Sequence, residues 1–215
     1  MSAPAWERTL EVRTADETHA LAAVLGFQLR AGDLLVLTGE LGAGKTTFAQ
    51  GLGEGLGVRA GIISPTFVLV RIHPNLPDGP RPGGPDLVHV DAYRLGSASE
   101  LDDIDLENTL DSAVTVVEWG RGRVEHLSES RLEVDLVRSL GGAPGAPAAP
   151  VDGAAAAAPD TATLAPGTLD FDTEDDNEPR TIVIRGFGPR WVDPPALPAP
   201  ARTVPTPAPR TQEGN

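Results

Sequence analysis

Cysteine is absent from this chain of 215 residues, lysine occurs only once, and aromatic residues make up 4%. Without cysteine, disulfide bonds, zinc–thiolate sites and iron–sulfur clusters are excluded. No apolar run approaches the roughly 18 residues that a membrane-spanning helix needs. The first residues, MSAPAWE, lack the basic start and apolar core of a signal peptide. These absences predict a cytoplasmic protein without a membrane segment.

Positive charge is also scarce, because 17 basic residues face 31 acidic ones and the formal net charge is −14. The acidic excess is densest in 139–179, a segment without lysine or arginine. Proteins that make direct contact with nucleic acid use lysine and arginine to neutralise its phosphates. An RNA-related function would therefore depend on a partner that holds the RNA.

Composition divides the chain into four parts. Residues 1–138 carry the apolar patterns of one α/β domain. Residues 139–179 are rich in alanine, proline and acid and have few large apolar side chains, which predicts a disordered insertion. Residues 180–191 return a final strand to the domain, paired with the strand over 131–137. Residues 192–215 are proline-rich and are predicted to be a disordered tail.

Apolar periodicity predicts the elements of the domain. Strands are predicted over 6–12, 33–38, 67–73, 87–91, 113–118, 131–137 and 181–185. A capping box, Thr14–Glu17, begins a helix that the leucine spacing extends to near Gly32. Further helices are predicted over 46–56 and 120–127, with a broken helical segment over 97–111. The stretch 74–86 joins two strands as a long hairpin loop.

The stretch GELGAGKT (39–46) matches G-x-x-x-x-G-K-[ST], the phosphate-binding loop. A buried strand is predicted before it and a helix after it, which is the order that the motif requires. Glycines let the backbone curl so that its N–H groups form a nest for phosphate, and the helix N-terminus adds partial positive charge. Lys45, the only lysine, reaches the β- and γ-phosphates, and the Thr46 hydroxyl is placed for Mg²⁺. The residues expected to contact the nucleotide are Gly39, Glu40, Leu41, Gly42, Ala43, Gly44, Lys45, Thr46 and Thr47.

Two acids end predicted strands, Asp91 and Glu118. In an α/β fold, residues at the carboxyl ends of strands face the ligand crevice. Glu118 occupies the place of the acid that holds Mg²⁺ directly or through water, although that acid is usually aspartate. Asp91 positions or deprotonates the attacking water, or shares the metal; the alternative is a solvated strand end. With Thr46, these two acids are the expected metal ligands.

Three other side chains are candidates for the same site. Thr66, in Ser64-Pro-Thr-Phe67, is either a loop threonine that senses the γ-phosphate through Mg²⁺ or an ordinary residue that opens a strand. Trp119 packs on the nucleotide base, on the Lys45 stem, on a partner or in the core. Arg94 is a candidate arginine finger.

Four motifs occur together: GELGAGKTTF (39–48), SPTF (64–67), HVDAYRL (89–95) and VEWG (117–120). In this order and spacing they resemble the bacterial TsaE (YjeE) family over about 8–138, with 180–186 as a further part. The resemblance implies a three-layer P-loop α/β fold with a mixed, mostly parallel sheet. It also implies an ATPase, with ATP and Mg²⁺, that is required for threonylcarbamoyladenosine (t6A) on tRNA. The implied partners are TsaB and TsaD, subunits of the threonylcarbamoyl transferase, and tRNA takes part only indirectly.

The resemblance also implies roles for individual residues. Lys45 and Thr46 would bind phosphate and Mg²⁺, and Asp91 and Glu118 would be the acidic pair of the hydrolytic site. Thr66 would lie in a switch-like loop, and Trp119 beside the nucleotide. The chain departs from the family pattern where the 74–86 loop and the 139–179 segment look long, and the proline-rich tail has no assigned counterpart.

Three functions compete for this sequence. The first is an ATPase that transfers the phosphoryl group directly to water. The second is a P-loop kinase acting on a small-molecule or protein hydroxyl. The lack of an obvious lid or acceptor domain counts against this alternative. The third is a nucleotide-dependent binding switch that hydrolysis resets. A guanine-reading motif of the N/T-K-x-D type is excluded, since Lys45 is the sole lysine.

Overall fold

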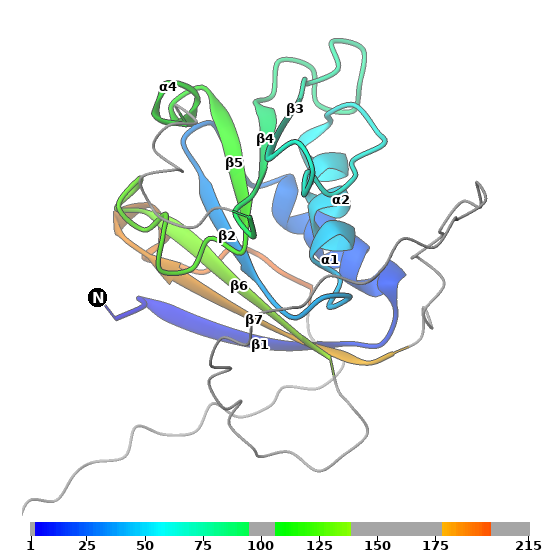
Figure 1. Cartoon of the computed structure of the whole chain (residues 1–215), viewed down its shortest axis with the longest axis vertical. Helices are drawn as coiled ribbons and strands as arrows, with labels where there is room; N and C mark the ends of the chain where they lie inside the picture. Colours follow the sequence, from blue (N-terminus) through cyan, green and yellow to red (C-terminus); the bar gives the residue numbers. More distant parts are fainter. Residues whose placement is uncertain (1–2, 95–105, 139–177, 199–215) are drawn as a thin grey trace, which may run out of the picture.

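The computed structural model of the chain describes residues 3–94, 106–138 and 178–198. Within these ranges, seven strands form one sheet in the order β1-β7-β6-β2-β5-β4-β3 (Figure 1). The strands are β1 (Trp6–Val12), β2 (Leu34–Thr38), β3 (Val70–His73), β4 (Asp86–Asp91), β5 (Ala113–Glu118), β6 (Arg131–Arg138) and β7 (Arg180–Phe187). The helices are α1 (Ala15–Gly26), α2 (Lys45–Leu56), α4 (Glu107–Leu110) and the short 3₁₀ helix η1 (Pro189–Trp191). Five of these strands run in one direction, and β3 and β7 run in the other, which confirms the mixed, mostly parallel sheet.

Three neighbouring strands are apolar along almost their whole length. The sequences of β2, β4 and β5 are LLVLT, DLVHVD and AVTVVE, and nearly all of their side chains are buried. Such continuous runs are typical of parallel strands covered on both faces. β2 pairs with β5, and β5 with β4, all in parallel. The carboxyl ends of these strands therefore meet at one edge of the sheet, where they place Thr38, Asp91 and Glu118.

Helices α1 and α2 lie side by side on one face of the sheet (Figure 1). Two glycines of α2 permit their close approach. A Cβ at Gly51 would lie 2.2 Å from the carbonyl oxygen of His19, and a Cβ at Gly55 would lie 2.1 Å from that of Ala23. The other face has a thinner third layer, in which α4 and the turns of 119–130 cover a second apolar cluster.

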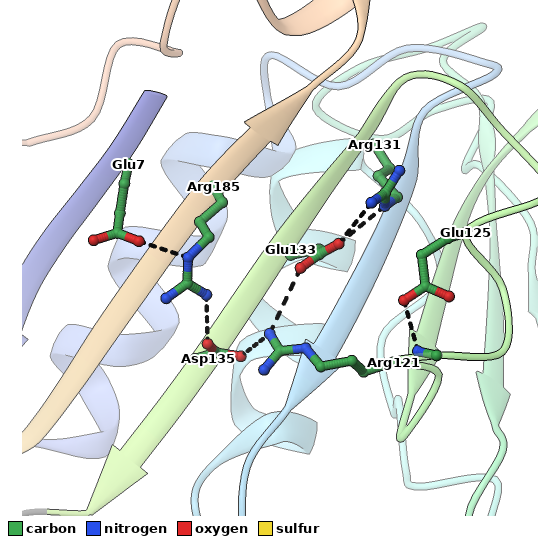
Figure 2. Close-up of polar contacts among 8 residues, drawn as sticks. Glu7, Arg121, Glu125, Arg131, Glu133, Asp135 and Arg185 are labelled. Carbon is green, nitrogen blue, oxygen red and sulfur yellow. Dashed lines mark hydrogen bonds and ion pairs between the residues drawn. The ribbon is translucent and has the colours of Figure 1, made fainter. Parts of the chain in front are cut away.

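The uncovered part of that second face, over β1, β7 and β6, carries a ladder of ion pairs (Figure 2). Arg185 bridges Glu7 and Asp135, at 2.6 Å to each carboxylate. Arg121, from the turn after β5, contacts both Asp135 and Glu133. The ladder therefore ties the turn after β5 to the β6–β7 hairpin.

The first helix is shorter than the sequence predicts. Its predicted cap is confirmed, because the Thr14 hydroxyl oxygen accepts a backbone hydrogen bond from the first turn at 3.1 Å. However, α1 ends at Gly26 and not near Gly32. The N–H groups of Gln28 and Leu29 bond to carbonyls three residues back, so the chain turns toward β2. Leu29 lies in this turn and is fully buried. Because it keeps the four-residue spacing of the leucines in α1, the sequence pattern resembled a longer helix.

The strand predicted over 67–73 begins only at Val70. The carbonyl oxygen of Pro65 accepts hydrogen bonds from two later N–H groups, those of Val68 and Leu69, at 2.9 and 2.7 Å. These bonds close a turn. Thr66 therefore lies in a turn and does not open a strand.

The helix predicted over 120–127 is also wrong, because these residues form successive turns. Gly122 has φ 77°, in the left-handed region, which a right-handed helix cannot accommodate. Of the helical segment predicted over 97–111, the structure contains α4, and residues 95–105 lie outside the described residues.

The β6–β7 hairpin confirms the predicted pairing of 131–137 with 181–185. Most of the predicted insertion, 139–177, and most of the predicted tail, 199–215, lie outside the described residues. The first tail residues contact the domain: Gln28 exchanges two side-chain hydrogen bonds with the backbone of Ala196, at 2.7 and 2.8 Å. None of the helices in the described ranges has the length and apolar character of a membrane span.

Candidate functional site

The phosphate-binding loop has the backbone that its glycines predict. Gly42 and Gly44 have φ values of 76° and 95°, a region that glycine adopts without steric cost. Gly44 is the N-cap of α2 and supplies no side-chain acceptor to the first turn. The helix therefore begins with N–H groups that a phosphate can accept from. Gly39 is needed for another reason, since a Cβ there would lie 2.6 Å from the Leu136 carbonyl oxygen of β6.

The side chain of Lys45, the first residue of α2, folds back onto this loop. Its ammonium donates hydrogen bonds to the carbonyl oxygens of Gly39 and Glu40, both at 2.9 Å, and the residue is only 6% exposed. Burial lowers the pKa of the Lys45 ammonium, while the negative charges of Glu118 and Asp91 act in the opposite direction. The charges of both carboxylates therefore offset part of the effect of burial on the Lys45 ammonium.

The two acids are neighbours, because Asp91 and Glu118 are Cα partners at the ends of β4 and β5. Each is 2% exposed. One carboxylate oxygen of Asp91 accepts hydrogen bonds from Thr66 Oγ1 at 2.6 Å and from Ser64 Oγ at 3.4 Å, and the other accepts from the Tyr93 N–H at 2.8 Å. Asp91 is therefore not a solvated strand end. It is held by the turn that contains Thr66.

Trp119 follows Glu118 directly and adopts φ 60°, which is uncommon for a residue other than glycine. Its N–H donates to the Leu37 carbonyl oxygen at 3.0 Å, which anchors it beside β2. The indole ring lies 4.1 Å from the Lys45 ammonium and 5.4 Å from the ring of Tyr93. Of the alternatives for Trp119, the structure shows contact with Lys45. Strained backbone of this kind occurs often at functional sites.

The chemistry of the donors at this edge suits magnesium. Two carboxylates and the Thr46 hydroxyl are hard oxygen ligands, and Mg²⁺ usually takes one or two carboxylates together with substrate phosphates and water. Within the described ranges, no cluster of three or more His, Cys, Asp or Glu side chains is arranged to hold a metal alone. The residues therefore fit a metal that arrives with phosphate oxygens.

The remaining residues expected at the site lie in the loop, in the first turn of α2 and shortly after β4. Thr46 and Thr47 lie half-buried in the first turn of α2, and Leu41 is exposed in the loop. The guanidinium of Arg94 stacks on the exposed ring of Phe67, with 4.9 Å between the guanidinium carbon and the ring centroid. Its role as an arginine finger stays a prediction.

Comparison with known proteins identifies the relatives of this chain. The sequence model of the family described as "Threonylcarbamoyl adenosine biosynthesis protein TsaE" matches residues 12–141. The chain belongs to the TsaE family. It is 59% identical to TsaE of Streptomyces coelicolor over 114 residues, 53% of this chain and 74% of the relative. It is 48% identical to TsaE of Mycobacterium tuberculosis over 136 residues, 60% of this chain and 79% of the relative.

A solved structure shares the architecture. The crystal structure of YdiB from Bacillus subtilis superposes with a TM-score of 0.56 at 26% identity, over 89% of this chain and 92% of the other. The fold is the P-loop α/β fold that the motifs predict.

The sequence did not single out three groups that the structure brings to this TsaE-family site. Ser64 contacts Asp91, and His89 contacts Glu118. Arg180, from β7, is 8% exposed, and its Nε would lie 3.5 Å from a Cβ at Gly44. The signal for His89 was present, because residues two apart on a strand share a face and His89 precedes Asp91 by two. Arg180 had no local signal, and it lies beyond the family match.

Proposed function

We propose that this TsaE-family protein binds ATP and Mg²⁺, hydrolyses ATP, and supports the formation of t6A on tRNA. Its relatives carry that pathway in their names: tRNA threonylcarbamoyladenosine biosynthesis protein TsaE. The partners are the transferase subunits TsaB and TsaD, tRNA takes part through them, and the location is the cytoplasm. The observation that carries the ATPase proposal is the geometry around the phosphate loop: the Lys45 ammonium is held by two loop carbonyl oxygens, and Asp91 and Glu118 lie side by side at the ends of β4 and β5.

Binding follows from the loop and from Lys45. The N–H groups of the loop and of the first turn of α2 donate hydrogen bonds to the phosphate oxygens. A lysine ammonium has three N–H donors. Two of those of Lys45 bond to loop carbonyls, which leaves the third for a phosphate oxygen. The Thr46 hydroxyl, Glu118 and Asp91 would hold magnesium, with Glu118 acting directly or through a water.

Hydrolysis follows from position and charge. A water oxygen attacks the γ-phosphorus, the bond to the β–γ bridging oxygen breaks, and ADP and phosphate leave. The proton that the water loses passes to the solvent. Asp91, oriented by Thr66 and the Tyr93 N–H, positions this water. When bound, magnesium neutralises charge on the phosphate oxygens. Lys45 supplies a second positive charge.

The test is phosphate release from ATP and Mg²⁺, measured with and without purified TsaB and TsaD and without any added acceptor. We expect release by the wild type and none by Lys45→Ala. Arg8→Ala, which removes an exposed positive charge from β1, is the matched control and should keep wild-type activity. Normal hydrolysis by Lys45→Ala would overturn the assignment. Release that requires a hydroxyl acceptor would instead support the kinase.

A further inference from the structure

A histidine is bonded to Glu118 inside the sheet. His89 Nε2 lies 2.9 Å from Glu118 Oε1, and the two side chains are 0% and 3% exposed. The Cα partner of His89 is Val116, whereas that of Glu118 is Asp91. The hydrogen bond is therefore a diagonal contact between adjacent strands. His89 therefore contacts Glu118 from the buried middle of the sheet, two residues before the strand end.

His89 is a polar exception among apolar neighbours. Leu87, Val114 and Val116, on the same face of β4 and β5, are all fully buried. A valine at 89 would suit that layer, and burying a polar ring there costs free energy unless it is hydrogen-bonded. Its Nδ1 is buried without a hydrogen-bond partner in the described part of the chain. The imidazole ring is therefore held through Nε2, which contacts Glu118. Buried polar atoms left without partners are rare and call for an explanation, of which a functional role is one.

The two acids are held by separate structures. Asp91 is held from outside the sheet, by Thr66, Ser64 and the Tyr93 N–H. Glu118 is held from inside the sheet, by His89. Oε1 of Glu118 is occupied by this bond, which leaves Oε2 for a metal or its water. A change at His89 should therefore act on Glu118 and leave the donors of Asp91 in place.

We propose that His89 is a positioning residue: its Nε2–H donates to Glu118 Oε1 and fixes the orientation in which Oε2 serves the metal and water of the hydrolytic site. The proposal deepens the ATPase function proposed above and rests on it for its kinetic consequences. Because the loop and Lys45 hold the phosphates, the loss of His89 should lower kcat and leave the KM for ATP within about 2-fold. Partners that orient metal ligands typically contribute about 10- to 100-fold, and we expect a kcat loss of that size.

Two amide variants separate positioning from packing. In His89→Gln, the side-chain amide nitrogen lies near the position of Nε2 and can still donate to Glu118. In His89→Asn, the amide lies near Nδ1 and falls short. We expect His89→Asn to lose kcat by about 10- to 100-fold and His89→Gln to recover most of it. Wild-type kcat in His89→Asn would overturn the proposal, as would equal loss of kcat and of thermal stability in both variants.

A double-mutant cycle tests whether His89 acts through Glu118. Once Glu118→Gln is present, His89→Asn should have little further effect on kcat. An effect of unchanged size would show that His89 acts elsewhere and would overturn the proposal. His73→Asn is the matched control: this buried histidine on β3 lies 6.4 Å from His89 between ring centroids, and kcat should stay at the wild-type value.

A nucleotide-free measurement separates this proposal from the ATPase function. In the ¹⁵N NMR spectrum of histidine-labelled protein, the His89 proton should be on Nε2, exchange slowly, and shift with Glu118→Gln but not with Asp91→Asn. A proton on Nδ1 alone, or no response to Glu118→Gln, would overturn the positioning role. If the spectrum fits but the wild type never hydrolyses ATP, even with TsaB and TsaD, the contact stands and the ATPase function fails.

Discussion

Gly51 lies in α2, the helix that begins at Lys45. Replacing it by alanine should loosen the contact between α2 and α1. The new Cβ would lie 2.2 Å from the His19 carbonyl oxygen and 2.8 Å from the Ala22 Cβ. The first of these atoms is backbone, so it can move only if α1 moves. The substitution therefore acts on the spacing of the two helices that cover the sheet.

Two opposing effects set the magnitude. Alanine stabilises a helix by roughly 0.5–1 kcal/mol relative to glycine. Overpacking a well-packed contact costs about 1–3 kcal/mol, and occasionally more. Because the clash involves backbone, we place Gly51→Ala toward the upper end of that range and expect a net destabilisation of about 1–2 kcal/mol. For a chain of this size that corresponds to a Tm decrease of about 2–8 °C.

Gly53→Ala is the matched control, because it lies in the same helix and gains the same helix propensity. Its Cβ would meet Ile62 Cδ1 at 2.2 Å and Val58 Cγ2 at 3.1 Å, which are ends of side chains that can rotate. We expect it to stay within about 1 kcal/mol of wild type. The assay is thermal and urea unfolding followed by circular dichroism. If Gly51→Ala proves as stable as Gly53→Ala, the reasoning about the helix contact is refuted.

Three further predictions concern the site and its surroundings. Glu118→Ala should impair turnover more than ATP binding, measured by phosphate release and calorimetry, and unchanged turnover would remove Glu118 from the mechanism. ATP binding should change the fluorescence of Trp119, whose ring lies over the Lys45 ammonium, and Trp119→Phe should abolish that change; a response that survives in the variant would assign it to another tryptophan. Burial lowers the pKa of His73, with the neighbouring His89 and Arg71 acting in the same direction. The unfolded chain therefore takes up a proton near the ordinary value of about 6.5 while the folded chain does not, so Tm should fall as pH decreases through that value. His73→Asn should flatten this slope, and an unchanged slope would contradict the assignment.

The local parts of the site could be predicted from the order of residues alone. The glycine-rich turn, the lysine at a helix start and the apolar strand before it depend only on neighbouring residues, so their pattern sufficed. Asp91 and Glu118 were placed at one edge because the ends of parallel strands meet there. The errors arose where a local signal had two meanings. Leu29 keeps helical spacing but is buried from a turn, and Gly122 interrupts a stretch that otherwise resembled a helix.

Contacts between side chains that are distant in the sequence became visible only in the folded chain. Thr66 reaches Asp91 over 25 residues, His89 reaches Glu118 over 29, and Arg180 comes to lie beside Gly44 from the far side of the insertion. Periodicity assigns a residue to one face of a strand, but a hydrogen bond needs two atoms within about 3 Å. That distance is set by strand register and by the packing of distant segments, which no local pattern contains.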